Sequence, residues 1–312
     1  MTRWFREVGD ASLFPAGSVV AIGAFDGVHR GHQCLLALAR ARAQAAGLAG
    51  VALSFEPLPR EFFAPQSPPP RLTPARTRFE LLRGLGMDAV GLLRFNRALA
   101  GMAAEDFVER VLVRGLSARV VCVGPDFRFG QGRSGDVALL GAMGERLGFE
   151  TVVAPQVDGA DGRRIGASAI REALRRGDLE SARAALGRRY AIAGKVVHGN
   201  RLGRWLGFPT ANIALRWRPP VDGIFAVRVS GAGLLAHPGV ASLGTRPTVA
   251  GNGPLVLESH LFDWSGDLYG KRLVVEFVAR LRGEARFDSL ETMTAQMHED
   301  ARQARAVLAR TD

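Results

Sequence analysis

The sequence has few cysteines and no long apolar run, and each scarcity excludes a class of protein. Among 312 residues there are two cysteines, Cys34 and Cys122, and both fall within apolar stretches. They indicate core thiols in a reducing compartment rather than a disulfide scaffold or a metal site. No apolar run approaches the length that spans a bilayer, and the N-terminus has no apolar signal region. We therefore expect a cytoplasmic protein with no membrane partner.

Lysine is also scarce, so the formal net charge of +11 comes almost entirely from arginine. Residues 1–187 contain 24 basic and 19 acidic side chains, and residues 188–312 contain 17 and 11. A nucleic-acid-binding protein remains a competing hypothesis, but it would concentrate this charge in a patch or tail. Because the excess is spread evenly, we expect no nucleic acid, and a small anionic ligand such as a nucleotide is compatible with this charge.

The hydrophobic pattern predicts two domains of different class. Buried-strand patterns at 19–22, 51–55, 88–93, 120–124 and 151–154 alternate with helical patterns at 33–46, 74–83, 103–113 and 136–147. This alternation predicts an α/β domain with a doubly wound, Rossmann-like parallel sheet.

After two short helices, at 167–176 and 179–186, the pattern becomes β-like. The runs are 192–197, 224–229, 234–243, 256–262 and 273–281, separated by turns without helices. They predict a small antiparallel barrel. A capping box at 288–291 opens a C-terminal helix ending near Leu308. We expect domains at 1–185 and 186–312.

Residues 23–32, Gly-Ala-Phe-Asp-Gly-Val-His-Arg-Gly-His, lie where the first strand passes to a helix. The start of a helix favours an anion, typically a phosphate. His29 and His32, three residues apart, lie on one face of the first turn. A tight turn with two surface histidines is the alternative. We expect phosphate contacts here, at Gly23, Phe25, Asp26 and Gly31 besides the histidines.

Two more glycine-containing stretches have candidate ligands. Ser168 and Arg171 enter a helix and suit a triphosphate, although a helix cap with a surface arginine fits them equally well. The loop at 124–136 contains Gly130-x-Gly132-x-x-Gly135. We reject it as a dinucleotide fingerprint because its strand ends too early. Its aromatic residues better suit a flat ring system.

The second domain contains a glycine-rich stretch at 199–212. Gly199, Gly203 and Gly207 allow the backbone to approach a phosphate. Thr210 and Asn212, two residues apart on an extended segment, offer hard oxygens for Mg²⁺. Glu258 lies within a strand among apolar neighbours. It is either solvent-facing or a general base, and alternation alone favours the solvent-facing interpretation.

Together these motifs resemble the bacterial bifunctional riboflavin kinase/FMN adenylyltransferase family over nearly the whole chain. The matching segments, besides the 23–32 turn, are residues 71–74, 123–136, 207–212, 244–248, 268–271 and 282–287. The resemblance implies a C-terminal domain that phosphorylates riboflavin to FMN with ATP and Mg²⁺. It implies an N-terminal domain that transfers AMP from a second ATP to FMN, giving FAD and pyrophosphate.

The resemblance also implies roles for residues. Glu258 becomes the base of the kinase step, and His29 and His32 stabilise charge in adenylyl transfer. The flavin-binding residues are Asp126, Phe127, Arg128 and Phe129. The family's Ser-Ser-Thr is Gly166-Ala167-Ser168 here, and Leu58, Phe225 and Ser242 replace residues common in the family. The alternative is riboflavin kinase alone, with a regulatory or nucleotide-binding N-terminal domain. We expect a monomer or weak homo-oligomer.

Overall fold

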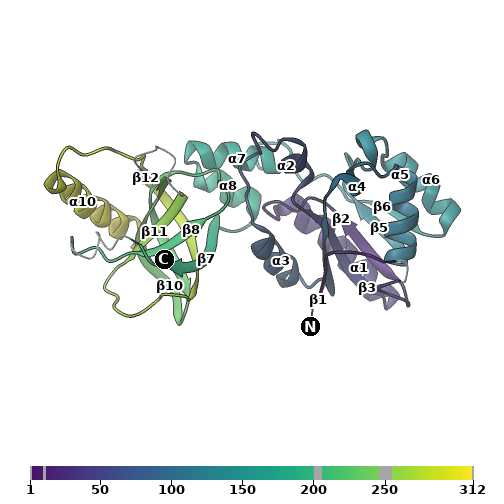
Figure 1. Cartoon of the computed structure of the whole chain (residues 1–312), viewed down its shortest axis with the longest axis horizontal. Coiled ribbons are helices and arrows are strands. Elements are labelled where there is room, and N and C mark those ends of the chain that lie inside the picture. Colours follow the sequence, from purple (N-terminus) through teal and green to yellow (C-terminus); the bar gives the residue numbers. More distant parts are fainter. Residues whose placement is uncertain (1, 10–11, 200–205, 246–254, 311–312) are drawn as a thin grey trace. The chain divides into compact units, whose positions relative to one another are not determined.

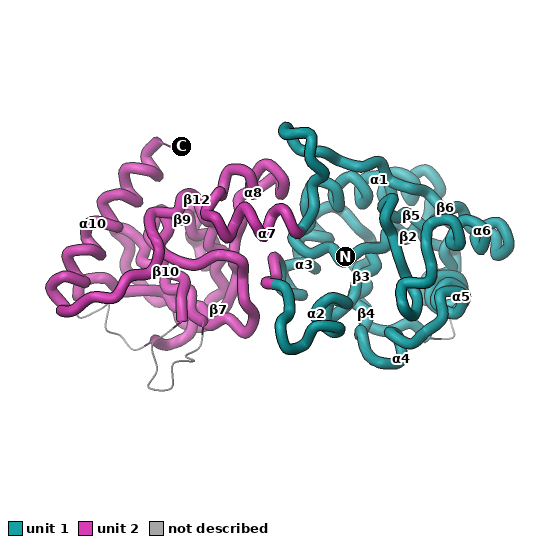
Figure 2. Tube along the Cα trace, turned by 90° about the horizontal axis from the view of Figure 1, so that it is seen from above, with its two compact units in different colours: residues 1–69, 73–167 teal, residues 70–72, 168–312 magenta. Residues whose placement is uncertain are grey.

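The structure, a computed structural model, describes residues 2–9, 12–199, 206–245 and 255–310. The chain forms two compact units (Figure 2): residues 1–69 and 73–167 in the first, and residues 70–72 and 168–312 in the second. By these contacts, α7 (Ala167–Arg176) and α8 (Leu179–Leu186) belong almost entirely to the second unit. The functional boundary near residue 185 stays a prediction. Within the described ranges, no helix is long and apolar enough to cross a bilayer.

The first unit contains a parallel sheet of six strands, in the order β1-β4-β3-β2-β5-β6. Every neighbouring pair is parallel, which confirms the predicted doubly wound class. The edge strand β1 was not predicted, because three residues are too few to display a period. The strands, all but β4 labelled in Figure 1, are β1 (Arg3–Phe5), β2 (Ser18–Ile22), β3 (Ala49–Glu56), β4 (Ala89–Arg94), β5 (Ala118–Val123) and β6 (Glu150–Val153).

Helices cover both faces of this sheet because alternate strand residues point to opposite sides. On one face, Val19 and Ala21 pack with α1 (Arg30–Ala46) and α3 (Ala75–Gly84). On the other, Val20 and Ile22 pack with η1 and α6. The predicted helix at 103–113 is a short α-helix that continues as a π-helix. The remaining helices are α2 (Pro59–Phe63), α4 (Arg97–Ala100), α5 (Ala104–Asp106), η1 (Phe107–Gly115), η2 (Gln131–Arg133) and α6 (Val137–Leu147).

The second unit contains a closed antiparallel barrel in the order β10-β11-β8-β7-β12-β9, which confirms the predicted class. Phe225 and Phe277 fill its core, edge to face with ring centroids 4.9 Å apart. The sequence pattern predicted only an extended segment at 211–215. In the structure this segment is a strand that pairs with β11 on one side and β7 on the other. The strands are β7 (Ala191–Val197), β8 (Ala211–Leu215), β9 (Gly223–Gly231), β10 (Leu234–Thr245), β11 (Leu255–Leu261) and β12 (Arg272–Arg282).

The C-terminal helix α10 (Leu290–Leu308) packs outside the barrel, with Ala304 and Leu308 buried against β9 and β10 residues. Its N-cap is Ser289, which accepts a hydrogen bond from the backbone of Thr292. The capping box predicted at 288–291 is therefore wrong by one residue. Since Ser and Asp are both good caps, the pattern left the register open.

A buried ion pair joins α10 to the barrel. The guanidinium of Arg282 contacts both carboxylate oxygens of Asp300, at 2.8 and 2.7 Å. Asp300 is only 4 % exposed, so replacing it by Asn leaves a largely buried cation without its counter-charge. We expect D300N to destabilise the second unit by about 3 kcal/mol. Hydrogen exchange of β9 and β12 peptides across a urea series measures this loss.

The matched control is D263N, which breaks the exposed pair of Asp263 and Arg305 between the barrel and the same helix. Exposed pairs contribute about 1 kcal/mol or less. Equal losses in the two variants would show that burial of the Arg282 pair is unimportant.

Candidate active sites

The topology of the sheet places two of the predicted motifs together. The chain leaves β2 towards β3 on one side, and later returns to pair β5 on the other side of β2. In doubly wound sheets, ligands bind at the carboxyl ends of the strands beside such a reversal. The turn at 23–32 follows β2, and the loop at 124–135 follows β5. The two motifs therefore border one crevice position.

The two histidines lie together at the start of α1. His29 is the N-cap, and its Nδ1 accepts the backbone N–H of His32 at 3.4 Å. Their rings stack with centroids 3.7 Å apart and planes inclined by 20°. The helix begins at Arg30 rather than at the predicted Gln33, because the His29 ring caps it. Since His29 accepts through Nδ1, its neutral form holds the proton on Nε2, from which it can donate to an anion.

His32 is a neutral imidazole at neutral pH. Burial, followed by the charges of His29 and Arg78, holds its pKa well below the ordinary value of 6.5. Its buried Nδ1 has no hydrogen-bond partner among the described residues. Protonation would place an N–H there with no acceptor, which is costly. His32 therefore contributes no positive charge to the turn at neutral pH, and the backbone N–H groups at the helix start supply the dipoles that favour an anion.

The remaining residues of the turn shape it. Phe25 is fully buried, and its ring meets that of His32 edge to face at 5.2 Å. Asp26 accepts hydrogen bonds from the backbone and hydroxyl of Thr73, at 2.9 and 3.2 Å. A side chain at Gly31 would lie 3.2 Å from the His29 ring, and one at Gly23 would lie 3.0 Å from Phe25. Contacts of these four residues with ATP stay a prediction.

The loop after β5 brings aromatic rings together. Phe127 and Phe129 stack at 5.3 Å, and Phe129 continues to Phe107 at 5.9 Å. Sequence reasoning missed the extension of this row, because its members come from α2, β3 and the segment after β4. Consecutive rings are 5.2 to 6.5 Å apart in the series Phe62, Phe95, Phe55, Phe107.

The charged residues of this loop are engaged in ion pairs. Asp126 pairs with Arg164, and Arg128 pairs with Asp136, the N-cap of α6. Gly132 lies in the short 3₁₀ turn η2, which begins eight residues beyond the end of β5, and Gly130 and Gly135 lie on either side of that turn. They therefore do not form the strand-to-helix turn that a dinucleotide fingerprint requires.

Ser168 and Arg171 lie on α7. Ser168 is exposed, and the Nε of Arg171 donates to the carbonyl of Pro70 at 2.6 Å. Both residues belong to the second unit. Their role in triphosphate binding stays a prediction.

Barrel closure aligns the kinase candidates. Glu258 on β11 lies directly opposite Asn212 on β8 and Ser242 on β10. Opposite residues in paired strands share a face, so these side chains form one row. Ser259, the next residue, is fully buried, so the row lies on the opposite face of β11, where Asn212 is itself only 5 % exposed.

Thr210 extends this row into a candidate metal site. The amide of Asn212 donates to the carbonyl of Thr210 at 3.2 Å and to its hydroxyl at 3.3 Å. Among the described residues, no cluster of three His, Cys, Asp or Glu could hold a metal ion. The oxygens of Thr210 and Asn212 nevertheless suit Mg²⁺, which usually binds few protein ligands together with substrate phosphates. Gly199 and Gly207 precede Thr210 in the described part of the chain, whereas Gly203 lies outside the described residues.

Comparisons with known proteins match both units. Residues 12–169 match the FAD synthetase family model, and residues 186–308 match the riboflavin kinase family model. A bifunctional riboflavin kinase/FMN adenylyltransferase of Pseudomonas fluorescens is 47% identical over 94% of each chain. One from Escherichia coli (strain K12) is 43% identical over 97% of each. The chain belongs to the bifunctional riboflavin kinase/FMN adenylyltransferase family.

The family assignment divides the candidate residues between two domains. The FAD synthetase match contains the histidine turn and the 124–135 loop, and the riboflavin kinase match contains Glu258 and Asn212. A crystal structure of a protein described as a macrolide-efflux protein from Streptococcus pneumoniae is also similar. Its TM-score is 0.78 at 29% identity, covering 96% of this chain and 97% of the other.

Proposed function

We propose that the chain catalyses two consecutive steps of flavin cofactor synthesis. The barrel phosphorylates riboflavin to FMN with ATP, and the first unit transfers AMP from a second ATP to FMN, releasing FAD and pyrophosphate. One observation carries this proposal: the histidine turn and the aromatic loop lie in the first unit, and Glu258 and Asn212 lie in the second, each pair within its own family model. The presence of both domains favours this function over riboflavin kinase alone.

Adenylyl transfer needs alignment more than a base. The FMN phosphate is already an oxyanion, so it can attack the α-phosphorus of ATP without losing a proton. A bond forms between an oxygen of the FMN phosphate and the α-phosphorus of ATP. The bond from that phosphorus to the oxygen bridging to the β-phosphate breaks, and pyrophosphate leaves. The helix N-terminus and the Nε2–H of His29 then donate to the α-phosphate oxygens, and His32 packs behind them. The aromatic row of Phe127 and Phe129 suits the flavin ring.

Riboflavin phosphorylation needs a base, because a ribityl hydroxyl is a weak nucleophile at neutral pH. Glu258 accepts the hydroxyl proton, the oxygen attacks the γ-phosphorus of ATP, and ADP leaves. The oxygens of Asn212 and Thr210 would hold Mg²⁺, which would supply neutralising charge for the ATP phosphates. Backbone groups at Gly199 and Gly207 approach the triphosphate.

The cysteines bear on the cellular compartment of the enzyme, and the two proposed reactions define its binding partners. Cys34 and Cys122 are free thiols, and burial raises the pKa of Cys122 to about 11. They fit a reducing compartment, and we propose a cytoplasmic enzyme. Its partners are the small molecules ATP, riboflavin and FMN, without nucleic acid. We propose a monomer or weak homo-oligomer.

The purified protein incubated with riboflavin, ATP and Mg²⁺ is expected to form FMN first and FAD after it. Chromatography of the flavins over time measures both. A plateau of FMN without FAD at high ATP would leave only the kinase step, and no FMN from riboflavin would reject the kinase assignment. A parallel incubation starting from FMN separates adenylyl transfer from the preceding step.

A further inference from the structure

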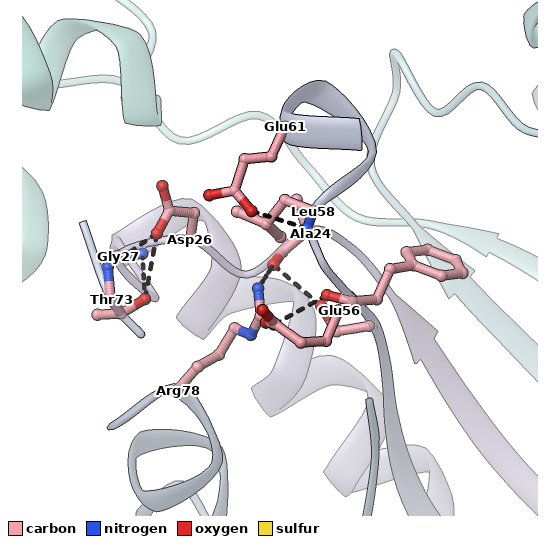
Figure 3. Close-up of polar contacts among 10 residues, drawn as sticks. Ala24, Asp26, Gly27, Glu56, Leu58, Glu61, Thr73 and Arg78 are labelled. Atoms are coloured by element: carbon pink, nitrogen blue, oxygen red, sulfur yellow. Dashed lines mark hydrogen bonds and ion pairs between the residues drawn. The ribbon is translucent and has the colours of Figure 1, made fainter. Parts of the chain in front are cut away.

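Arg78, on α3, is fully buried beneath the turn at 23–32 (Figure 3). Its Nη1 donates to the carbonyl of Ala24 at 3.2 Å. Its Nη2 donates to the carbonyl of Phe55 at 2.8 Å and to the carboxylate of Glu56 at 2.6 Å. One guanidinium thus connects the turn after β2 with the end of β3.

Stability alone is a weak reason for such an ion pair. Removing two charges from water offsets much of their attraction, and apolar pairs of similar volume often stabilise a fold as well. The planar guanidinium does something that an apolar side chain cannot: it holds two backbone carbonyls at fixed positions. The hydroxyl of Ser54 donates to the same Ala24 carbonyl at 3.0 Å. Two side-chain donors, from Ser54 and Arg78, therefore hold the carbonyl of Ala24 in place.

The position of Ala24 matters because the next residue has an unusual backbone conformation. Phe25 has a φ of 49°, in the left-handed region that a non-glycine residue adopts only when its surroundings impose it. The conformation directs the Phe25 ring against His32. A displacement of Ala24 would pass through Phe25 to the imidazole. The charge of Arg78 also acts on His32 directly, because it helps to hold the pKa of that ring below its ordinary value.

We propose that Arg78 is a positioning residue for adenylyl transfer, which with Glu56 fixes Ala24 and Phe25 and so holds the His32 ring in place behind the His29 donor. This proposal rests on the proposed role of the histidine turn. The charged and titratable groups in question are His29 on the turn itself, Arg78 from α3 and Glu56 from β3. Arg78 acts through these neighbours rather than by touching the reacting atoms.

The first test measures kcat and KM for FAD formation from FMN in R78M across pH 5 to 9. A misplacement of about 1 Å reduces catalysis by roughly 100-fold, so we expect kcat to fall by about that factor. The acid limb of the kcat/KM profile should move up, because His32 loses a neighbouring cation that opposes its protonation. R78K keeps the charge without the planar fork. It should lose kcat while its acid limb stays in place.

Two controls separate positioning from folding. R76M, on the same helix, breaks only the exposed pair with Glu80, and both activities should stay within twofold of wild type. FMN formation by the barrel normalises the amount of protein in every sample, and hydrogen exchange of β2 and β3 peptides reports whether the first unit is folded. The double variant E56Q/R78M removes both charges, so it leaves no buried charge unpaired if R78M alone fails to fold.

The outcomes are distinct. A folded double variant with low FAD formation and a raised acid limb supports the proposal. FAD formation within twofold of wild type in R78M, or in the folded double variant, would overturn it. If H32A loses FAD formation while all Arg78 variants retain it, only the positioning role fails. If H32A also retains it, the proposed function of the histidine turn fails.

Discussion

Replacing Glu258 by Gln is expected to reduce FMN formation from riboflavin by about 1,000-fold, while conversion of supplied FMN to FAD continues at the wild-type rate. A positioned general base contributes roughly 10² to 10⁴ to the rate, and Gln cannot accept the hydroxyl proton. The change keeps the shape of the side chain and its register opposite Asn212 and Ser242. Steady-state assays started separately from riboflavin and from FMN measure the two effects.

The matched control is E276Q, which changes a carboxylate on β12 that lies opposite Arg228 of β9. Glu276 lies between two buried residues of its strand, Val275 and Phe277, just as Glu258 lies between two buried residues of β11. This variant should retain FMN formation within about twofold, as expected for a surface substitution away from the chemistry. If E258Q and E276Q behave alike, Glu258 is the solvent-facing strand residue of the alternative interpretation.

Replacing His32 by Ala is expected to have the opposite selectivity: FAD formation falls by about 100-fold or more, and FMN formation is unchanged. The variant removes the ring that stacks on His29 and meets Phe25. Loss of an aligned donor array at a reacting phosphate costs about 10² to 10³ in rate. C34A, two residues further along the same helix, is the control. Loss of both activities in folded H32A would contradict a two-site enzyme.

The same variant has a stability signature with a defined sign. The pKa of His32 is lowered in the folded protein, so the unfolded chain binds the extra proton first as the pH falls. The contribution of His32 to the free energy of unfolding of the wild type is therefore fully present above pH 6.5, the ordinary pKa of histidine, and decreases as the pH falls below it. The slope reaches about 1.4 kcal/mol per pH unit. In H32A that slope should be absent, which urea unfolding of the first unit at pH 7 and pH 5.5 tests.

The sequence predicted the class of both domains because each is encoded by a repeating local pattern. Strand and helix periods alternate up to residue 155, and period-two runs dominate after 190. Short elements without a period were missed, such as β1 and α2. Helix starts were wrong for two reasons: an imidazole, which is an unusual cap, caps α1, and for α10 Asp288 and Ser289 are adjacent good caps of which Ser289 is used.

The candidate sites were predicted unevenly for a related reason. His29 and His32 are adjacent because of local spacing, so their stacking follows from the sequence. The alignment of Glu258 with Asn212 depends on strand register around a closed barrel, which no local pattern determines. Arg78 resembles a solvent-facing helix residue in the sequence, and only the tertiary structure reveals that it is buried. The aromatic row likewise draws on separate elements.

The separate cores of the two units have a consequence for how the enzyme can change over generations. Because each unit packs its own hydrophobic clusters, a substitution in one core leaves the contacts of the other intact. Selection can therefore slow or accelerate one reaction without a compensating change in the other. Mutations in one domain can therefore change the ratio of FMN to FAD that a single polypeptide produces, without mutations in the other domain.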